Sequence, residues 1–178
     1  KDILTTHAVY WPTILMSAGI ELPETIFAHG WWLMGDSKMS KSIGNVVNPI
    51  DLIDDYGVDP VRYFLMREMV LGQDSNFTME LFINRYNSDL ANDFGNLLSR
   101  VSTLMKKNYN GEIPNPGELN ESELNIKRDS IVLNKSVDKM MRKMQLNESI
   151  ELIMKFVRNV NKYMEDNAPW KLVKKDLK

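Results

Sequence analysis

The sequence predicts a mainly α-helical protein in which a short α/β portion precedes a bundle of helices. Residues 25–34 are rich in aromatic and β-branched side chains, which is typical of a strand. A glycine-bounded loop follows them, and in α/β folds such a loop lies at a sheet edge, where ligands bind. From Thr78 onward, apolar residues recur every three or four positions, which is the spacing of amphipathic helices.

Length and composition limit the possible classes of protein. The chain has 178 residues, enough for one ordinary domain or two small ones. It has no cysteine, so a disulfide scaffold and a thiolate zinc site are excluded, and with two histidines we expect no metal site. No apolar run approaches the ~20 residues of a membrane span, and the first residues lack the layout of a signal peptide. We therefore expect a soluble, cytoplasmic protein.

Charge is unevenly distributed along the chain. The formal net charge is −2, but residues 1–126 carry −8 and residues 127–178 carry +6. The last third could therefore attract an RNA backbone, although a basic helix face that is merely solvated would have the same composition.

Residues 35–45, with the sequence GDSKMSKSIGN, predict a loop that binds an anion. Lys38 and Lys41 offer ammonium groups and the serines between and beside them offer hydroxyls, while the flanking glycines let the loop move and approach a ligand. A phosphate chain is the ligand that this chemistry favours. The Walker pattern does not fit, because Ser40 occupies the position of the glycine before its Lys–Ser pair. The alternative is a solvated basic turn.

The first helix is predicted to run from a cap at Asp2 to a stop at Gly19, with a kink at Pro12. One face combines apolar side chains with one imidazole, and it is either a buried stripe or the wall of a ligand site. Its residues are Ile3, His7, Trp11, Leu15 and Ala18.

Two short helices should follow the loop. Asn48–Pro49 can begin one that ends at Gly57, and Asp59–Pro60 can begin another. Neither contains a catalytic constellation. The two tryptophans of residues 25–34 and His29 are interpreted as packing residues.

A long helix is predicted from Thr78, with one packing face and one polar stripe. Asparagine and arginine four residues apart can address unpaired base edges, as single-stranded RNA loops require, although an ordinary polar face is the alternative. The packing face comprises Phe82, Tyr86, Leu90, Phe94, Leu97, Val101 and Leu104, and the polar stripe comprises Asn92, Asn96, Arg100 and Thr103.

Two further amphipathic helices are predicted, the second capped by Asn147, before a helix start that carries Trp170. We interpret their methionines as side chains that fill the core. The apolar positions are Ile126, Leu133, Val137, Met140 and Met144 in the first helix and Ile150, Ile153, Val157, Val160 and Met164 in the second.

Residues 38–42 read KMSKS, the signature loop of class I aminoacyl-tRNA synthetases, and the chain resembles the bacterial methionyl-tRNA synthetase family. The resemblance covers nearly the whole chain. The segments that carry it are AHGWW at 28–32, GNVV at 44–47, YFL at 63–65, DLAND at 89–93, GNLLSR at 95–100 and APW at 168–170.

The resemblance implies three regions. Residues 1–47 would be the C-terminal part of a Rossmann-type catalytic domain, residues 48–77 a connecting module that contacts the tRNA stem, and residues 78–178 a helical bundle that binds the anticodon, truncated at its C-terminus. Because the chain begins at Lys1 without an initiator methionine, we expect a fragment.

The resemblance also assigns roles to individual residues. Lys41 would be the main contact to the transition state, with Lys38 in support. ATP would be bound by Asp2, near the ribose, and by Lys38, Met39, Ser40, Lys41 and Ser42. Ile3 and His7 would lie beside methionine, whose thioether suits apolar walls and one orienting imidazole. Asn96, Arg100 and Trp170 would read the anticodon.

The implied reaction is the activation of L-methionine by ATP, with Mg²⁺, to methionyl-adenylate and its transfer to tRNA(Met). The family's His-Ile-Gly-His segment and its zinc-binding insert are absent from this sequence, so the fragment should not activate methionine alone. Two alternatives remain: another class I synthetase, for valine, leucine, isoleucine or cysteine, and a non-catalytic RNA-binding module.

Overall fold

Helices make up most of the chain and one small sheet joins them, which confirms the predicted mainly α class. The computed structural model describes residues 3–35, 37–40, 42 and 44–176. In chain order the elements are η1 (Thr6–Tyr10), α1 (Trp11–Ala18), β1 (Trp32–Met34), β2 (Ser37–Lys38), α2 (Pro49–Tyr56), α3 (Val58–Glu68), β3 (Ser75–Asn76), α4 (Met79–Arg85), η2 (Tyr86–Gly95), α5 (Asn96–Tyr109), α6 (Glu121–Arg142), α7 (Leu146–Asn167) and α8 (Pro169–Asp176), where η marks a π-helix.

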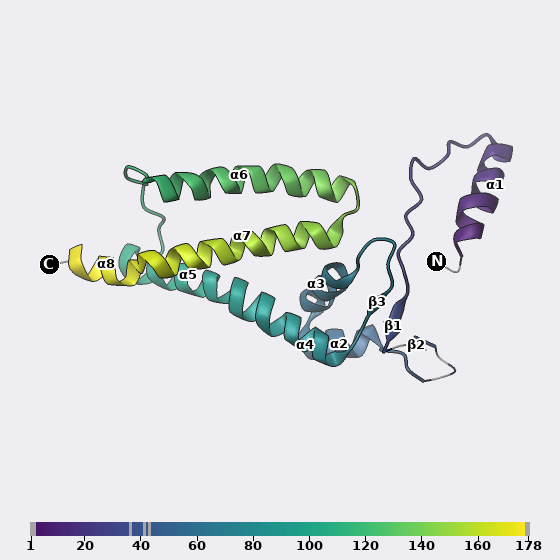
Figure 1. The fold of residues 1–178 in the computed structure, drawn as a ribbon, viewed down its shortest axis with the longest axis horizontal. Helices are drawn as coiled ribbons and strands as arrows, with labels where there is room; N and C mark the ends of the chain where they lie inside the picture. Colours follow the sequence, from purple (N-terminus) through teal and green to yellow (C-terminus); the bar gives the residue numbers. More distant parts are fainter. Residues whose placement is uncertain (1–2, 36, 41, 43, 177–178) are drawn as a thin grey trace.

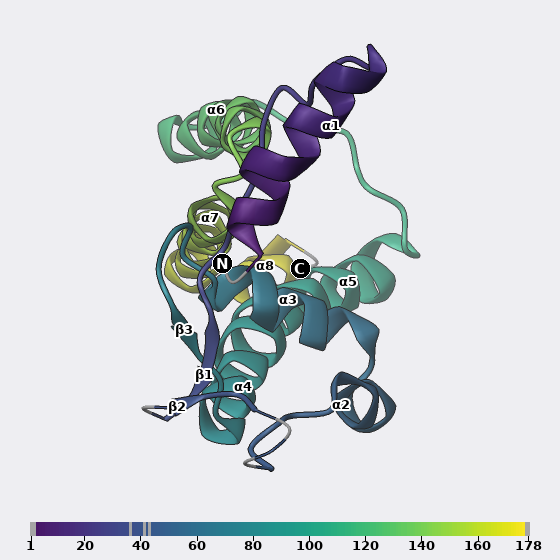
Figure 2. The same cartoon turned by 90° about the vertical axis from the view of Figure 1, so that its right-hand side faces the viewer.

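The molecule is elongated, with α1 and α8 at opposite ends of its long axis (Figure 1). Helices α6 and α7 lie side by side and antiparallel, and α5 runs beneath α7 toward α8. Figure 2 shows the strands beside α3 and α4, below α1 and α6 in that view. None of the helices in the described residues has the length and apolarity needed to cross a bilayer.

The sheet has the strand order β2-β1-β3, in which β1 pairs antiparallel with β2 and parallel with β3. Strand β3 follows α3, so it brings the segment after that helix back beside β1. Gly30 permits this approach, because a Cβ atom there would lie 1.9 Å from the Gln73 carbonyl oxygen.

The predicted strand at residues 25–34 is much shorter than expected, because only Trp32–Met34 is strand. A strand needs a neighbouring backbone, and within the described residues β1 pairs with two residues of β2 and two of β3. Side-chain composition favours extension over the whole segment, but pairing limits the strand.

The core beside the sheet is aromatic. Phe64 is 1% exposed and meets Phe77 and Phe82 edge to face, with ring centroids 5.4 and 5.5 Å apart. Trp32 of β1 packs against this cluster, and so does Met39 of the loop at residues 35–45, hereafter the lysine loop. The core thus connects the loop to α3 and α4.

The predicted signals at the ends of α2 are confirmed. Asn48 caps the helix by accepting a hydrogen bond from the backbone N–H of Ile50 at 3.1 Å, and the helix ends before Gly57. Helix α3 begins at Val58, one residue before the predicted Asp59–Pro60 start.

The first helix ends at Gly19, as predicted, with φ of 68° in the left-handed region that glycine favours. Instead of a simple kink, a π-helical segment, η1, precedes Pro12. The predicted cap, Asp2, lies outside the described residues.

The long helix predicted from Thr78 exists, and the Thr78 hydroxyl caps it by accepting a hydrogen bond from the Leu81 N–H. Its packing face is partly wrong. Phe94 is 50% exposed and Val101 is 38% exposed, whereas Asp89 is only 4% exposed. The reason is the spacing: three steps of four residues turn Phe94 about 120° from Phe82 in an α-helix, whereas Asp89, seven residues after Phe82, lies within about 20° of its side.

The two helices that follow begin differently from each other. Asn120 and Glu123 form a reciprocal capping box at the start of α6. The predicted cap of α7 is wrong, since Gln145 occupies that position and Asn147 lies in the first turn. The chain reverses at Met144, where φ is 58°, so α7 begins earlier than expected.

Candidate functional site

The lysine loop begins at the end of β1. Gly35 turns the chain with φ of 63°, and β2 then pairs Lys38 with Leu33. This pairing fixes the backbone at Lys38 to the edge of the sheet. The structure therefore places Lys38 where the sequence predicts it. Lys41 and its role lie outside the described residues.

Asn45 closes the loop by hydrogen bonding across it. Its side-chain oxygen accepts from the Ser40 N–H at 2.7 Å, and its amide donates to the Ser37 hydroxyl at 3.1 Å and to the Lys38 carbonyl at 3.3 Å. The hydroxyls of Ser40 and Ser42 lie 2.8 Å apart. The sequence reasoning did not assign Asn45 this role, which a lone asparagine after a glycine does not indicate.

Lys38 contacts an aromatic ring that we had interpreted as packing. Its Nζ lies 4.2 Å from the centroid of the Trp31 ring, a cation–π contact. The backbone N–H of Trp31 donates to Asp74 Oδ1 at 2.8 Å. Trp32, by contrast, packs against Phe64 as expected, with ring centroids 6.1 Å apart.

His7 of η1 lines two hollows beside the first helix. It lines a cavity of ≈ 220 Å³ together with Ile3 and with residues 26–29, and a second one of ≈ 470 Å³ together with Trp11. Its Nδ1 is 3.0 Å from the Ile3 carbonyl oxygen. The structure thus brings Ile3 and His7 together, as predicted, with mainly apolar neighbours.

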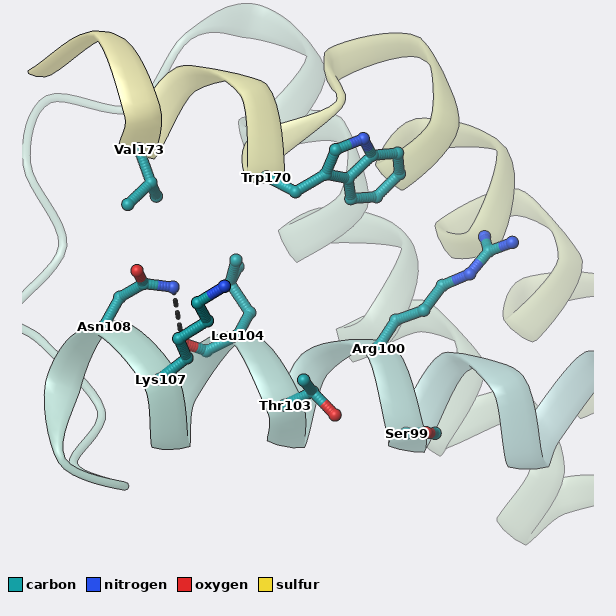
Figure 3. Close-up of a pocket in the computed structure, with 8 residues that line it drawn as sticks. All are labelled: Ser99, Arg100, Thr103, Leu104, Lys107, Asn108, Trp170 and Val173. Atoms are coloured by element: carbon teal, nitrogen blue, oxygen red, sulfur yellow. Dashed lines mark hydrogen bonds between the residues drawn. The ribbon is translucent and has the colours of Figure 1, made fainter.

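A third hollow lies between α5 and α8 (Figure 3), with a volume of ≈ 500 Å³. Arg100 and Trp170 both line it, on opposite sides, so the structure brings together two of the three residues predicted to read an anticodon. Asn96 does not line this cavity; it is exposed one turn before Arg100 on the same helix. Arg100 Nη1 lies 3.3 Å from Glu165 Oε1 of α7.

Other residues of this cavity were not singled out as readers. The Lys107 side chain reaches into the space between α5 and Trp170 in Figure 3. The Asn108 amide donates to the Leu104 carbonyl at 2.9 Å. The lining combines an indole, an arginine and a lysine with a mostly apolar surface, which suits a stacked base beside a phosphate. The remaining lining residues are Ser99, Thr103 and Val173.

Charged groups gather between α3, η2 and α7, away from the three cavities. Asp89 Oδ2 accepts a hydrogen bond from the Tyr63 hydroxyl at 2.7 Å and lies 3.5 Å from Arg85 Nη1. Burial and this hydrogen bond raise the pKa of Tyr63. No group of three or more His, Cys, Asp or Glu side chains suited to a metal ion occurs among the described residues.

Comparisons with known proteins agree on one family. The model of the family described as "tRNA synthetases class I (M)" matches residues 1–102. The Methionine--tRNA ligase of Caldanaerobacter subterraneus subsp. tengcongensis is 44% identical over 100% of this chain, and Methionine--tRNA ligase 1 of Bacillus anthracis is 46% identical over 98%. The chain spans only 28% and 26% of the length of these curated relatives.

A solved structure gives the same result. The Mycobacterium tuberculosis methionyl-tRNA synthetase in complex with methionyl-adenylate superposes with a TM-score of 0.92 and 43% identity, over 97% of this chain and 34% of that chain. Sequence and fold therefore agree over nearly all of the chain, and the chain belongs to the methionyl-tRNA synthetase family of class I aminoacyl-tRNA synthetases.

Proposed function

We propose that this chain is part of a methionine--tRNA ligase, which activates L-methionine with ATP and Mg²⁺ and transfers it to tRNA(Met) in the cytoplasm. The observation that carries the proposal is the lysine loop: Asn45 hydrogen bonds across it and β2 holds Lys38 at the sheet edge. Support comes from relatives named Methionine--tRNA ligase and from the likeness to a synthetase solved with methionyl-adenylate.

The reaction requires charge neutralisation more than covalent chemistry by the protein. A methionine carboxylate oxygen attacks the α-phosphorus of ATP, the bond to the bridging oxygen breaks, and pyrophosphate leaves. Ammonium groups near the leaving oxygens stabilise the charge that develops there. Lys41 is the proposed main contact and Lys38 its support, with Met39, Ser40 and Ser42 completing the ATP-binding loop.

The proposed methionine site is the region of Ile3 and His7. The ≈ 220 Å³ cavity that they share is lined mainly by apolar side chains, which suit a thioether, and the His7 imidazole can orient a polar group. Asp2 is proposed to lie near the ATP ribose.

The proposed tRNA site is the cavity between α5 and α8, where Trp170 would stack on an anticodon base and Arg100 would contact a base edge. Asn96, one turn before Arg100 on α5, is proposed to contact the same anticodon loop of the tRNA. On this view residues 1–47 belong to the catalytic domain, residues 48–77 connect it, and residues 78–178 bind the anticodon.

The catalytic part is tested by ATP–pyrophosphate exchange with methionine in the full-length gene product. We expect Lys41→Ala to slow exchange by about 10²–10³-fold, the scale for losing one preorganised charge stabiliser. Lys135→Ala, at an exposed position of α6, is the matched control and should leave the rate unchanged. Exchange at the wild-type rate in Lys41→Ala would refute the assignment.

The RNA part is tested by separating two activities. Asn96→Ala, Arg100→Ala or Trp170→Ala should reduce tRNA charging and leave methionine-dependent exchange nearly intact. An equal loss of both activities would indicate misfolding and count against a reading role.

The cavity between α5 and α8 also supports a second candidate, a non-catalytic module that binds RNA. In that case the full-length gene product would bind an anticodon stem-loop but catalyse no exchange with any amino acid. Running the exchange assay with valine, leucine, isoleucine and cysteine beside methionine also tests the other class I specificities.

A further inference from the structure

The ten residues of η2, Tyr86–Gly95, separate α4 from α5 and end directly before the helix that carries Arg100. π-Helical segments are rare, and many of them occur at functional sites. Neither the catalytic loop nor the cavity between α5 and α8 uses a side chain of η2. The segment nevertheless determines how α5 leaves α4.

Gly95 is suited to the π-turn because of space, not because of its backbone angles. Its φ of −64° and ψ of −42° are ordinary helical values that any residue adopts. A Cβ atom at this position, however, would lie 2.9 Å from the carbonyl oxygen of Leu90, five residues earlier. The next residue, Asn96, donates its N–H to the Ala91 carbonyl, again five residues earlier.

The π-segment changes which residues face the bundle. Successive residues of an α-helix are turned by about 100°, whereas residues of an i→i+5 helix are turned by less, so the ten residues of η2 change the direction in which the side chains of α5 point. Arg100, in the second turn of the helix that follows η2, lines the cavity opposite Trp170 of α8 (Figure 3).

Contacts from two other helices hold η2 in place. The Tyr63 hydroxyl of α3 donates to Asp89 at 2.7 Å, where the carboxylate is almost fully buried. The Asn161 amide of α7 donates to the Asp93 carbonyl at 2.8 Å. Both contacts reach η2 from outside its own helix, so the segment is fixed by tertiary structure.

We infer that η2 sets the rotational position of α5, and that Gly95 is the positioning residue that lets the RNA-binding face point at Trp170. The inference rests on the proposed RNA-binding function and adds a cause for the geometry of that site. Gly95 touches no ligand in this account; it acts through Arg100 and its neighbours on α5.

The test is Gly95→Ala in the full-length gene product. Alanine has a higher helix propensity than glycine, so if helix propensity alone mattered, the substitution would stabilise the bundle or leave its stability unchanged. A clash with Leu90 should instead rotate α5. We expect the affinity for an RNA stem-loop with the anticodon CAU to fall about tenfold or more, the scale of losing one stacked base.

Three measurements separate positioning from unfolding. The affinity for the CAU stem-loop is divided by the affinity for a stem-loop with a changed anticodon, and this ratio should fall in Gly95→Ala. The melting temperature and the rate of adenylate formation should stay unchanged. Gly117→Ala is the matched control, because no atom lies within 4 Å of its added Cβ. Wild-type affinity and an unchanged ratio in Gly95→Ala would overturn the inference.

If Gly95→Ala does not fold, Asn161→Ala decides the question, since it removes the contact to Asp93 without adding bulk. We expect a smaller loss of affinity in the same direction, and unchanged binding would overturn the inference. A different result would refute the proposed function itself: the wild-type protein would bind the two stem-loops with equal affinity.

Discussion

Asn45 offers a direct test of how the lysine loop is held. Asn45→Ala removes three hydrogen bonds, to the Ser40 N–H, the Ser37 hydroxyl and the Lys38 carbonyl. Each is worth about 0.5–1.5 kcal/mol net, and the last, at 3.3 Å, belongs at the low end. Solvent competes for the exposed members, so we expect a total of about 1–3 kcal/mol, or about 5- to 150-fold in the population of the held loop.

The assay is ATP–pyrophosphate exchange in the full-length gene product at saturating methionine. We expect kcat/KM for ATP to fall by about 5- to 150-fold in Asn45→Ala, because the loop must be ordered again in the transition state. The melting temperature should stay nearly constant, since the hydrogen bonds of Asn45 lie within the loop, apart from the aromatic core.

Two further variants make the result specific. Asn45→Asp keeps the oxygen that accepts from Ser40 but loses both donated bonds, so its kcat/KM should lie between those of wild type and Asn45→Ala. Asn115→Ala, at an exposed position between α5 and α6, should behave as wild type. A wild-type kcat/KM in Asn45→Ala would show that the loop does not depend on this side chain.

Three other substitutions or conditions test the fold. Gly30→Ala should prevent β3 from docking on β1, because its Cβ would lie 1.9 Å from the Gln73 carbonyl oxygen, and circular dichroism should show a lower melting temperature. Asn120→Ala should cost about 1 kcal/mol in urea unfolding by breaking the capping box with Glu123. Burial, then the hydrogen bond to Asp89, raises the pKa of Tyr63 above its ordinary 10.0, so the unfolded chain loses this proton first. Through this group, stability should fall by up to about 1.4 kcal/mol per pH unit above pH 10. Tyr63→Phe should make the fall shallower, while Tyr163, whose pKa burial also raises, keeps its own part of it.

Local chemistry explains which parts of the fold were predicted from the sequence. Asn48 and Thr78 satisfy backbone groups at their own helix starts, and Gly19 adopts the left-handed conformation that ends α1. Each signal acts within a few residues, so it can be read without knowing the rest of the fold.

The incorrect predictions are at positions where the structure depends on residues far away in the sequence. The strand at residues 25–34 was predicted too long because its extent depends on β2 and β3, and β3 arrives more than forty residues later. The packing face after Thr78 was predicted from apolar residues alone, whereas a buried carboxylate, Asp89, occupies the core-facing side of η2. A charged residue in that position is not expected unless its partners, here Tyr63 and Arg85, are known.

The candidate sites were predicted unevenly for a related reason. The loop sequence indicated Lys38, and the i, i+4 spacing indicated the face of Arg100, because both signals are short-range. The pairing of Arg100 with Trp170 depends on α8 returning beside α5, 70 residues later in the chain, and only the resemblance to a family suggested it. Asn45 and Trp31 were missed as partners of the loop because nothing in their sequence spacing distinguishes them from packing or capping residues.

The charged cluster between α3, η2 and α7 explains how the two ends of the molecule are kept in one orientation. Arg67 of α3 pairs with Glu151 of α7 and lies 3.7 Å from Asp89 of η2, while Arg158 of α7 lies 2.7 Å from Glu151. Arg67 and Asp89 are largely buried, and burying their charges costs desolvation energy that their attraction only offsets, so apolar side chains of similar volume would hold the helices about as tightly. Apolar helix surfaces, however, can pack in several relative positions, whereas an ion pair forms only when its two side chains meet. Because α3 also carries the aromatic core beneath the lysine loop, we interpret the cluster as what fixes that loop relative to the cavity between α5 and α8.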